Sequence, residues 1–143
     1  MTIIVTDAGF GKDDPACGAD AALTLEELRA SADGTVALRL ANTADADEVA
    51  PFFGHISLII VDFPSFADGR GFSLARRLRQ AGYTGRLRAE GHVIADQYAH
   101  ARRVGFDEVA IPDDLAARQP ERQWLARAGW QNHFYQKRLQ AGA

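Results

Sequence analysis

The segment "DGRG" (68–71) follows the strongly apolar run "SLIIVDF" and places an arginine between two glycines where a helical pattern begins. Glycines let the backbone turn closely, and the first turn of a helix presents free N–H groups. Arg70 adds a planar donor that is always charged. These groups suit a small oxyanion or a carboxylate. In the structural alternative, Asp68 or Ser73 only caps the helix. Arg70 then pairs with Asp62 or Asp68 to hold the loop.

Arg88 is a candidate on another apolar run, "RLRAEG" (86–91). Side chains alternate between the two faces of a strand, so Arg86, Arg88 and Glu90 would share one face. An inner strand should not bury three unpaired charges. Either this strand is less central than its neighbours, or its charges line a site.

His92, Asp96 and His100 recur at every fourth residue, which puts them on one face if the segment is a helix. At 1.5 Å per residue the first and last would lie about 12 Å apart along the axis, so one ion cannot bind all three. We interpret them as a polar surface and expect no metal site.

The sequence lacks the familiar cofactor signals. Its single cysteine, Cys17, cannot by itself hold an iron–sulfur cluster or form a Cys-x-x-Cys pair. The glycines of "DAGFGKDD" lack the spacing of a phosphate loop, and no complete dinucleotide fingerprint is present. We therefore expect no bound cofactor.

Hydrophobic periodicity predicts the elements that position these residues. Five short apolar runs read as strands, and segments of helical period separate them. This alternation predicts an α/β fold with a mainly parallel five-stranded sheet in three layers, flavodoxin-like or Rossmann-like, of order 2-1-3-4-5. Ligands would bind beyond the carboxyl ends of the strands. The expected strands are 2–7, 35–40, 57–63, 86–91 and 108–112. The second of these alternates polar and apolar residues, as an edge strand does.

Local signals support these boundaries. Thr24 and Glu27 have the spacing of a capping box for a helix around 25–31. Two helices are expected to end in Schellman motifs, in which a glycine is followed by an aromatic residue that packs back on the last turn. These pairs are Gly82 with Tyr83 and Gly105 with Phe106.

Length and composition predict one ordinary domain, 1–143, with a helical tail at 113–143 that Pro120 interrupts. A net charge of −3 gives no basic field for nucleic acid. No apolar run is long enough for a membrane span and no signal peptide is evident, so we expect a cytoplasmic protein. The aromatic residues of the tail would cover the sheet or form a partner or homodimer surface. They are Trp124, Trp130, Phe134 and Tyr135.

As a whole, the segment "DGRGFSLARRLRQAGYTGRLRAEGHVIADQ" with "RVGFDEV" resembles a bacterial family known as domain of unknown function 934. The resemblance is strongest over 57–112. Family members are labelled oxidoreductases of sulfite reduction and look like small companions of sulfite reductase. The matching positions are Asp68, Gly69, Arg70, Gly71, Ser73, Leu78, Arg79, Tyr83, Gly85, Arg88, Gly91, Asp96, Gln97, Gly105, Phe106 and Asp107.

The resemblance implies a pathway, assimilatory sulfite reduction, and gives weight to Arg70, Arg88, Asp96 and Gln97. We expect an accessory factor that contacts sulfite reductase or another sulfur-assimilation protein and can bind a small oxyanion. The residues expected to bind are Asp68, Arg70, Ser73, Arg88 and Gln97. One alternative is a small enzyme with Asp62 or Asp96 as base, in which Arg70 and Arg88 hold an anionic substrate. Another is a homodimeric interaction module.

Overall fold

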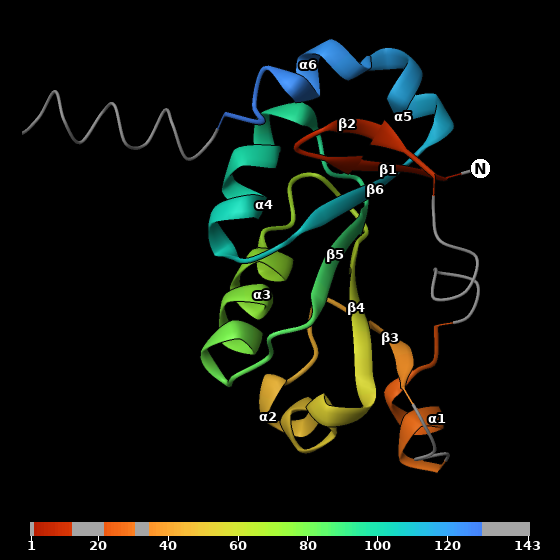
Figure 1. Cartoon of the computed structure of the whole chain (residues 1–143), viewed down its shortest axis with the longest axis vertical. Helices are drawn as coiled ribbons and strands as arrows, with labels where there is room; N and C mark the ends of the chain where they lie inside the picture. Colours follow the sequence, from red (N-terminus) through yellow and green to blue (C-terminus); the bar gives the residue numbers. More distant parts are fainter. Residues whose placement is uncertain (1, 13–21, 31–34, 130–143) are drawn as a thin grey trace, which may run out of the picture.

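The computed structural model describes residues 2–12, 22–30 and 35–129. These residues form an α/β fold with one six-stranded mixed sheet of order β2-β1-β6-β5-β4-β3 (Figure 1). Cys17 and three of the tail aromatics, Trp130, Phe134 and Tyr135, lie outside the described residues. The strands are β1 (Thr2–Thr6), β2 (Gly9–Gly11), β3 (Val36–Leu40), β4 (Ile56–Phe63), β5 (Arg86–Gly91) and β6 (Glu108–Pro112).

Helices α3 and α4 lie along one face of the sheet, and α5 and α6 lie at the end near β1 and β2 (Figure 1). None of the described helices is long and apolar enough to cross a membrane. The α-helices are α1 (Leu25–Ala30), α2 (Ala46–Val49), α3 (Arg70–Gln80), α4 (Tyr98–Val104), α5 (Asp113–Arg118) and α6 (Glu121–Leu125). Two 3₁₀ helices are η2 (Ala50–His55) and η3 (Ala95–Gln97).

All five expected strands are present, but the predicted order 2-1-3-4-5 is wrong. Strands β3, β4, β5 and β6 are parallel neighbours, as the alternation with helices predicts. Strand β1 does not lie between any two of these strands. It runs antiparallel to β6, with Ile3 opposite Ile111 and Val5 opposite Val109. A pattern of apolar residues identifies a strand. It does not identify the neighbouring strand, because several strands have equally apolar faces.

The sixth strand was not expected from the sequence. The glycine-containing segment after β1 turns back as β2 and pairs antiparallel with β1. Gly9 has φ +112°, a conformation that glycine adopts readily and other residues rarely do. The hairpin forms one edge of the sheet, and β3 forms the other edge, as its alternating pattern predicts.

Most of the core lies between the sheet and the helices α3 and α4. Ile59, Val61 and Leu87 of the sheet are fully buried there, together with Leu74 and Leu78 of α3. The opposite face carries a smaller apolar cluster with charged residues around it. That cluster is Ala37, Leu58 and Ile60, against which Ala22 packs. The described residues thus show one mixed sheet, and the predicted three-layer Rossmann-like arrangement is not confirmed.

The predicted helix ends are confirmed. The backbone N–H of Thr24 donates to Glu27, and the N–H of Glu27 donates to the Thr24 hydroxyl, which is the expected capping box. Gly82 and Gly105 both have positive φ, and the N–H groups of Tyr83 and Phe106 each donate to a carbonyl five residues earlier. Both junctions are therefore Schellman motifs.

The tail contributes to the core through one aromatic residue in its described part. Pro120 is the N-cap of α6, so it starts a helix as expected. Trp124 of α6 is 1% exposed and packs edge-to-face on Tyr98, with ring centroids 6.1 Å apart. Its indole N–H donates to the carbonyl of Gln119 at 2.9 Å.

Candidate functional site

The candidates in "DGRG" form a closed set of bonds at the start of α3. Oδ1 of Asp68 accepts the backbone N–H of Arg70 at 3.1 Å and its Nε at 3.0 Å, and Oδ2 accepts Nη2 at 2.7 Å. Nδ2 of Asn42 donates to the same carboxylate at 2.9 Å. The Arg70 guanidinium, its backbone N–H and Asn42 hold the pKa of Asp68 well below its usual range. Arg70 therefore holds the loop, as in the structural alternative.

This pairing does not bury Arg70, whose side chain is 63% exposed. The guanidinium can therefore also contact a molecule in solution. Its role in anion or partner binding stays a prediction.

The two glycines beside Arg70 have different roles. A Cβ at Gly71 would lie 2.5 Å from Cζ of Phe63, so glycine is needed there for α3 to approach β4 closely. A Cβ at Gly69 would meet its nearest neighbour, in Phe72, only at 4.0 Å. The sequence pattern is thus partly a packing requirement between α3 and the sheet.

Gln97 fixes the loop that precedes α3. Its Nε2 donates to the carbonyl of Phe66 at 2.7 Å, and its Oε1 accepts the N–H of Ile94 at 3.0 Å. Within the loop, the hydroxyl of Ser65 accepts the N–H of Ala67 at 3.2 Å. The side chain of Phe66 is nevertheless 59% exposed. The loop thus presents an aromatic ring to solvent from a backbone that is held in place.

Arg88 lies elsewhere, on the face of the sheet away from α3. It is fully buried, and its Nε donates to Oε2 of Glu108 at 2.7 Å. Arg86 also binds Glu108, with Nη2 2.9 Å from Oε1. Strand β5 lies between β4 and β6, inside the sheet, and its two arginines pair with an acidic residue of β6. The enzyme hypothesis requires Arg88 and Arg70 to line one pocket, and they do not.

Asp62 belongs to the same charged face. Its Oδ1 lies 2.5 Å from Nη1 of Arg39, which also binds Glu90. Three arginines and three acidic residues therefore meet on neighbouring strands, and this face is balanced in formal charge. The six residues are Arg39, Arg86, Arg88, Asp62, Glu90 and Glu108.

Asp96, the other candidate base, is 74% exposed in η3 and pairs with Arg127 of the tail at 2.7 Å. It lines a cavity of about 290 Å³ with Gln119 and Gln123, between η3 and α6. Asp62, near the end of β4, pairs with Arg39, whereas Asp96 of η3 pairs with Arg127, so the two candidate bases have different partners.

The histidine spacing does not produce one helical face. His92 lies in the bend after β5, Asp96 in η3 and His100 in α4. The expectation of a continuous helix from 92 to 100 is wrong, because the segment begins as a loop and a 3₁₀ turn. Among the described residues, no three His, Cys, Asp or Glu side chains could hold one metal ion.

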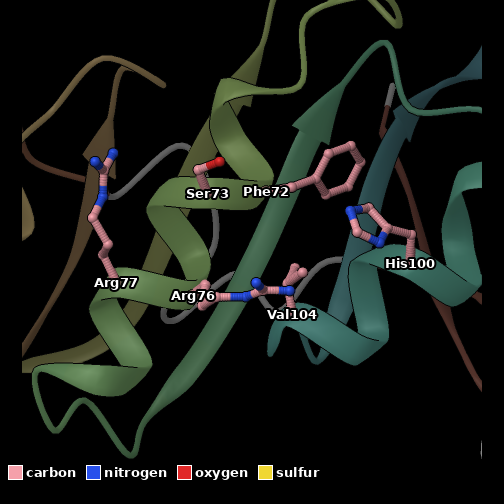
Figure 2. Close-up of a pocket in the computed structure, with 6 residues that line it drawn as sticks. All are labelled: Phe72, Ser73, Arg76, Arg77, His100 and Val104. Carbon is pink, nitrogen blue, oxygen red and sulfur yellow. The ribbon is translucent and has the colours of Figure 1, made fainter.

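A pocket of about 340 Å³ lies between α3 and α4 (Figure 2). Its walls combine aromatic and basic side chains with one hydroxyl. The rings of Phe72 and His100 meet edge-to-face with centroids 4.6 Å apart. The lining residues are Phe72, Ser73, Arg76, Arg77, His100 and Val104.

The pocket is electrically positive. Partial burial lowers the pKa of His100, and the charges of Arg76 and Arg103 lower it further. No acidic side chain within the described ranges pairs with Arg76 or Arg77. The sequence patterns pointed to two residues of this pocket, Ser73 and His100, but separately. The missed signal was a pair of adjacent arginines on each of two neighbouring helices, 76–77 and 102–103.

Comparison with known proteins gives one match. Residues 37–142 match the family model described as bacterial protein of unknown function (DUF934). No curated protein and no solved structure matches the chain significantly. Since the matched segment covers most of the chain, the protein belongs to this bacterial family of unknown function.

Proposed function

We propose that the protein is an accessory factor of assimilatory sulfite reduction that binds a partner protein at the carboxyl edge of its sheet. The pathway is the one that the resemblance to family 934 implies. The mode of action comes from the geometry of the candidate residues. The partner is sulfite reductase or another protein of sulfur assimilation.

The ion pairs of the two candidate bases favour a role in binding a partner protein over a role in catalysis. Asp62 is held by Arg39, and Asp96 by Arg127. A general base must reach the proton that it removes. Each of these two alternative bases already pairs with an arginine.

The exposed ring of Phe66 carries the proposal. Gln97 and Ser65 fix the backbone around it, so little conformational freedom would be lost when a partner covers the ring. Aromatic residues in ordered positions are frequent anchors of protein interfaces. Arg70, four residues further on at the start of α3, adds an exposed cation that suits a partner carboxylate or an oxyanion.

The test compares Phe66→Ala with Leu125→Ala, because these two are the large apolar residues that the described part of the chain exposes. Sulfite reductase from the same bacterium is immobilised, and binding of each purified variant is measured. We expect Phe66→Ala to weaken binding at least tenfold without lowering thermal stability, and Leu125→Ala to bind like the wild type. Equal binding by all three proteins would contradict the proposed surface.

A genetic test addresses the pathway. In a host whose own copy is deleted, and in which that deletion impairs growth on sulfate, the wild-type gene should restore growth and Phe66→Ala should not. Bound flavin, haem or iron in the absorption spectrum of the purified protein would contradict the accessory role. Light scattering at several concentrations detects the homodimer, and a dimer that Phe66→Ala dissociates would assign the surface to a second copy of the chain.

A further inference from the structure

We propose that the pocket between α3 and α4 binds an acidic segment of a polypeptide, with an apolar side chain between its carboxylates. This inference is independent of the proposed function, because it concerns the outer surface of two helices and shares no residue with the loop of Phe66. It also holds whether or not the protein takes part in sulfite reduction.

The charges of the pocket point to an anionic ligand. Two arginines, Arg76 and Arg77, line it, while the chain as a whole has a net charge of −3. Most other arginines of the described residues are held by acidic groups, such as Arg39 by Asp62 and Glu90. Arg76 and Arg77 have no acidic partner there, so a carboxylate from outside could bind them without displacing one.

The directions of the arginines favour a ligand with more than one negative group. Arg76 extends toward Val104 beneath His100, whereas Arg77 points to the other side of α3 (Figure 2). A single sulfate or phosphate is best held by donors that converge on it. The backbone N–H groups at these two positions lie inside α3, and helix interiors use such groups for their own bonds. Two carboxylates spaced along a polypeptide match this divergent arrangement.

The floor of the pocket supplies an apolar contact. Phe72 and Val104 are both nearly buried, and the ring of His100 stands edge-to-face with that of Phe72. An aliphatic or aromatic side chain between two acidic residues can cover these groups while its neighbours reach the arginines. The hydroxyl of Ser73 adds one polar contact at the rim.

The experiment uses the full chain and a fluorescent synthetic peptide of alternating glutamate and leucine, with an otherwise identical glutamine peptide as its neutral counterpart. Fluorescence anisotropy measures binding at low salt and at about 0.5 M salt, where exposed charges are screened. We expect the glutamate peptide to bind and the glutamine peptide not to bind. High salt should weaken binding, and sulfate or phosphate at equal concentration should compete poorly.

Two double variants with the same change of charge identify the place of binding. Arg76→Ala with Arg77→Ala should weaken binding of the glutamate peptide at least tenfold. Arg118→Ala with Arg122→Ala, on α5 and α6, should change it less than twofold. An equal loss in both would show general charge attraction and overturn the site. Competition by sulfate as strong as by the peptide would make it a small-oxyanion site instead. Circular dichroism confirms that both variants are folded.

Discussion

The guanidinium of Arg79 donates two hydrogen bonds to the carbonyl oxygen of Gly105, from Nε at 3.0 Å and from Nη2 at 2.8 Å. Its Nη1 donates to the carbonyls of Tyr83 and Gly85, and Nη2 also donates to Asp107. One side chain therefore joins the end of α3 to the turn between α4 and β6. The role of Arg79 at this junction is therefore structural.

Replacing Arg79 should destabilise the fold. Arg79→Ala leaves three partly buried carbonyls without their charged donor, so we expect the free energy of unfolding to fall by about 2 kcal/mol. Arg79→Lys should recover only part of this loss, because an ammonium group cannot reproduce the planar fork. Urea denaturation followed by circular dichroism measures both.

Arg76→Ala is the matched control, because Arg76 is an exposed arginine of the same helix with no acidic partner among the described residues. We expect its effect on unfolding to stay within about 0.5 kcal/mol. Similar losses for the two variants would mean that the hydrogen bonds of Arg79 add little to stability.

The two glycines around Arg70 should respond differently to alanine. Gly71→Ala places a methyl group 2.5 Å from the ring of Phe63, so we expect a loss of about 1–3 kcal/mol in the free energy of unfolding. Gly69→Ala meets no close atom and has φ −86°, so it should be nearly neutral. Thermal unfolding of the two variants separates these outcomes, and a neutral Gly71→Ala would show that α3 can shift away from β4.

Local sequence patterns were sufficient for five of the six strands and for the predicted helix ends, because both depend on residues that are close in the chain. The capping box of Thr24 and the Schellman motifs at Gly82 and Gly105 are local structures of this kind. The position of β1 was not predictable in this way. Its partner β6 lies about a hundred residues away, and the apolar faces of several strands would have matched it equally well.

In the candidate site, too, contacts between residues close in the chain were predictable and contacts between distant residues were not. Asp68, two residues before Arg70, was one of the two partners that the sequence suggested for it, and the two are paired in the structure. The partner of Arg88 could not be predicted, because the order of the strands does not give the register that places Glu108 opposite Arg88. The pocket between α3 and α4 was missed for a similar reason, since it forms only where the two helices lie side by side.

The pKa of His100 should depend on Arg76. Partial burial first, and then the charges of Arg76 and Arg103, hold this pKa below the usual value of about 6.5. Arg76→Ala removes one positive charge, so the pKa of His100 should rise toward that value. NMR titration of the histidine ring measures the shift, and Arg118→Ala on α5 should leave it unchanged.

The same group should make stability depend on pH. Because the pKa of His100 is lower in the folded state, the unfolded state binds more protons below about pH 6.5. The contribution of neutral His100 is therefore complete above that pH and is lost as the pH falls through the lowered pKa. The free energies of unfolding of wild type and His100→Gln are measured between about pH 7.5 and 5, the range in which histidine titrates. Toward the acidic end, the wild-type value should fall relative to that of the variant. Parallel curves would contradict the lowered pKa.

Arg70 and Asp68 allow the role of the loop to be separated from that of the cation. Arg70→Ala and Asp68→Asn both break the ion pair, and both should lower stability only slightly because Arg70 is largely exposed. Only the first removes the positive charge, whereas the second leaves Arg70 free to bind a partner carboxylate or an oxyanion. If Arg70 serves binding, Arg70→Ala should fail to restore growth on sulfate and should lose affinity for sulfite reductase, while Asp68→Asn keeps both.

Equal failure of the two folded variants would assign the pair to loop structure. Full rescue by Arg70→Ala would show that the cation is dispensable.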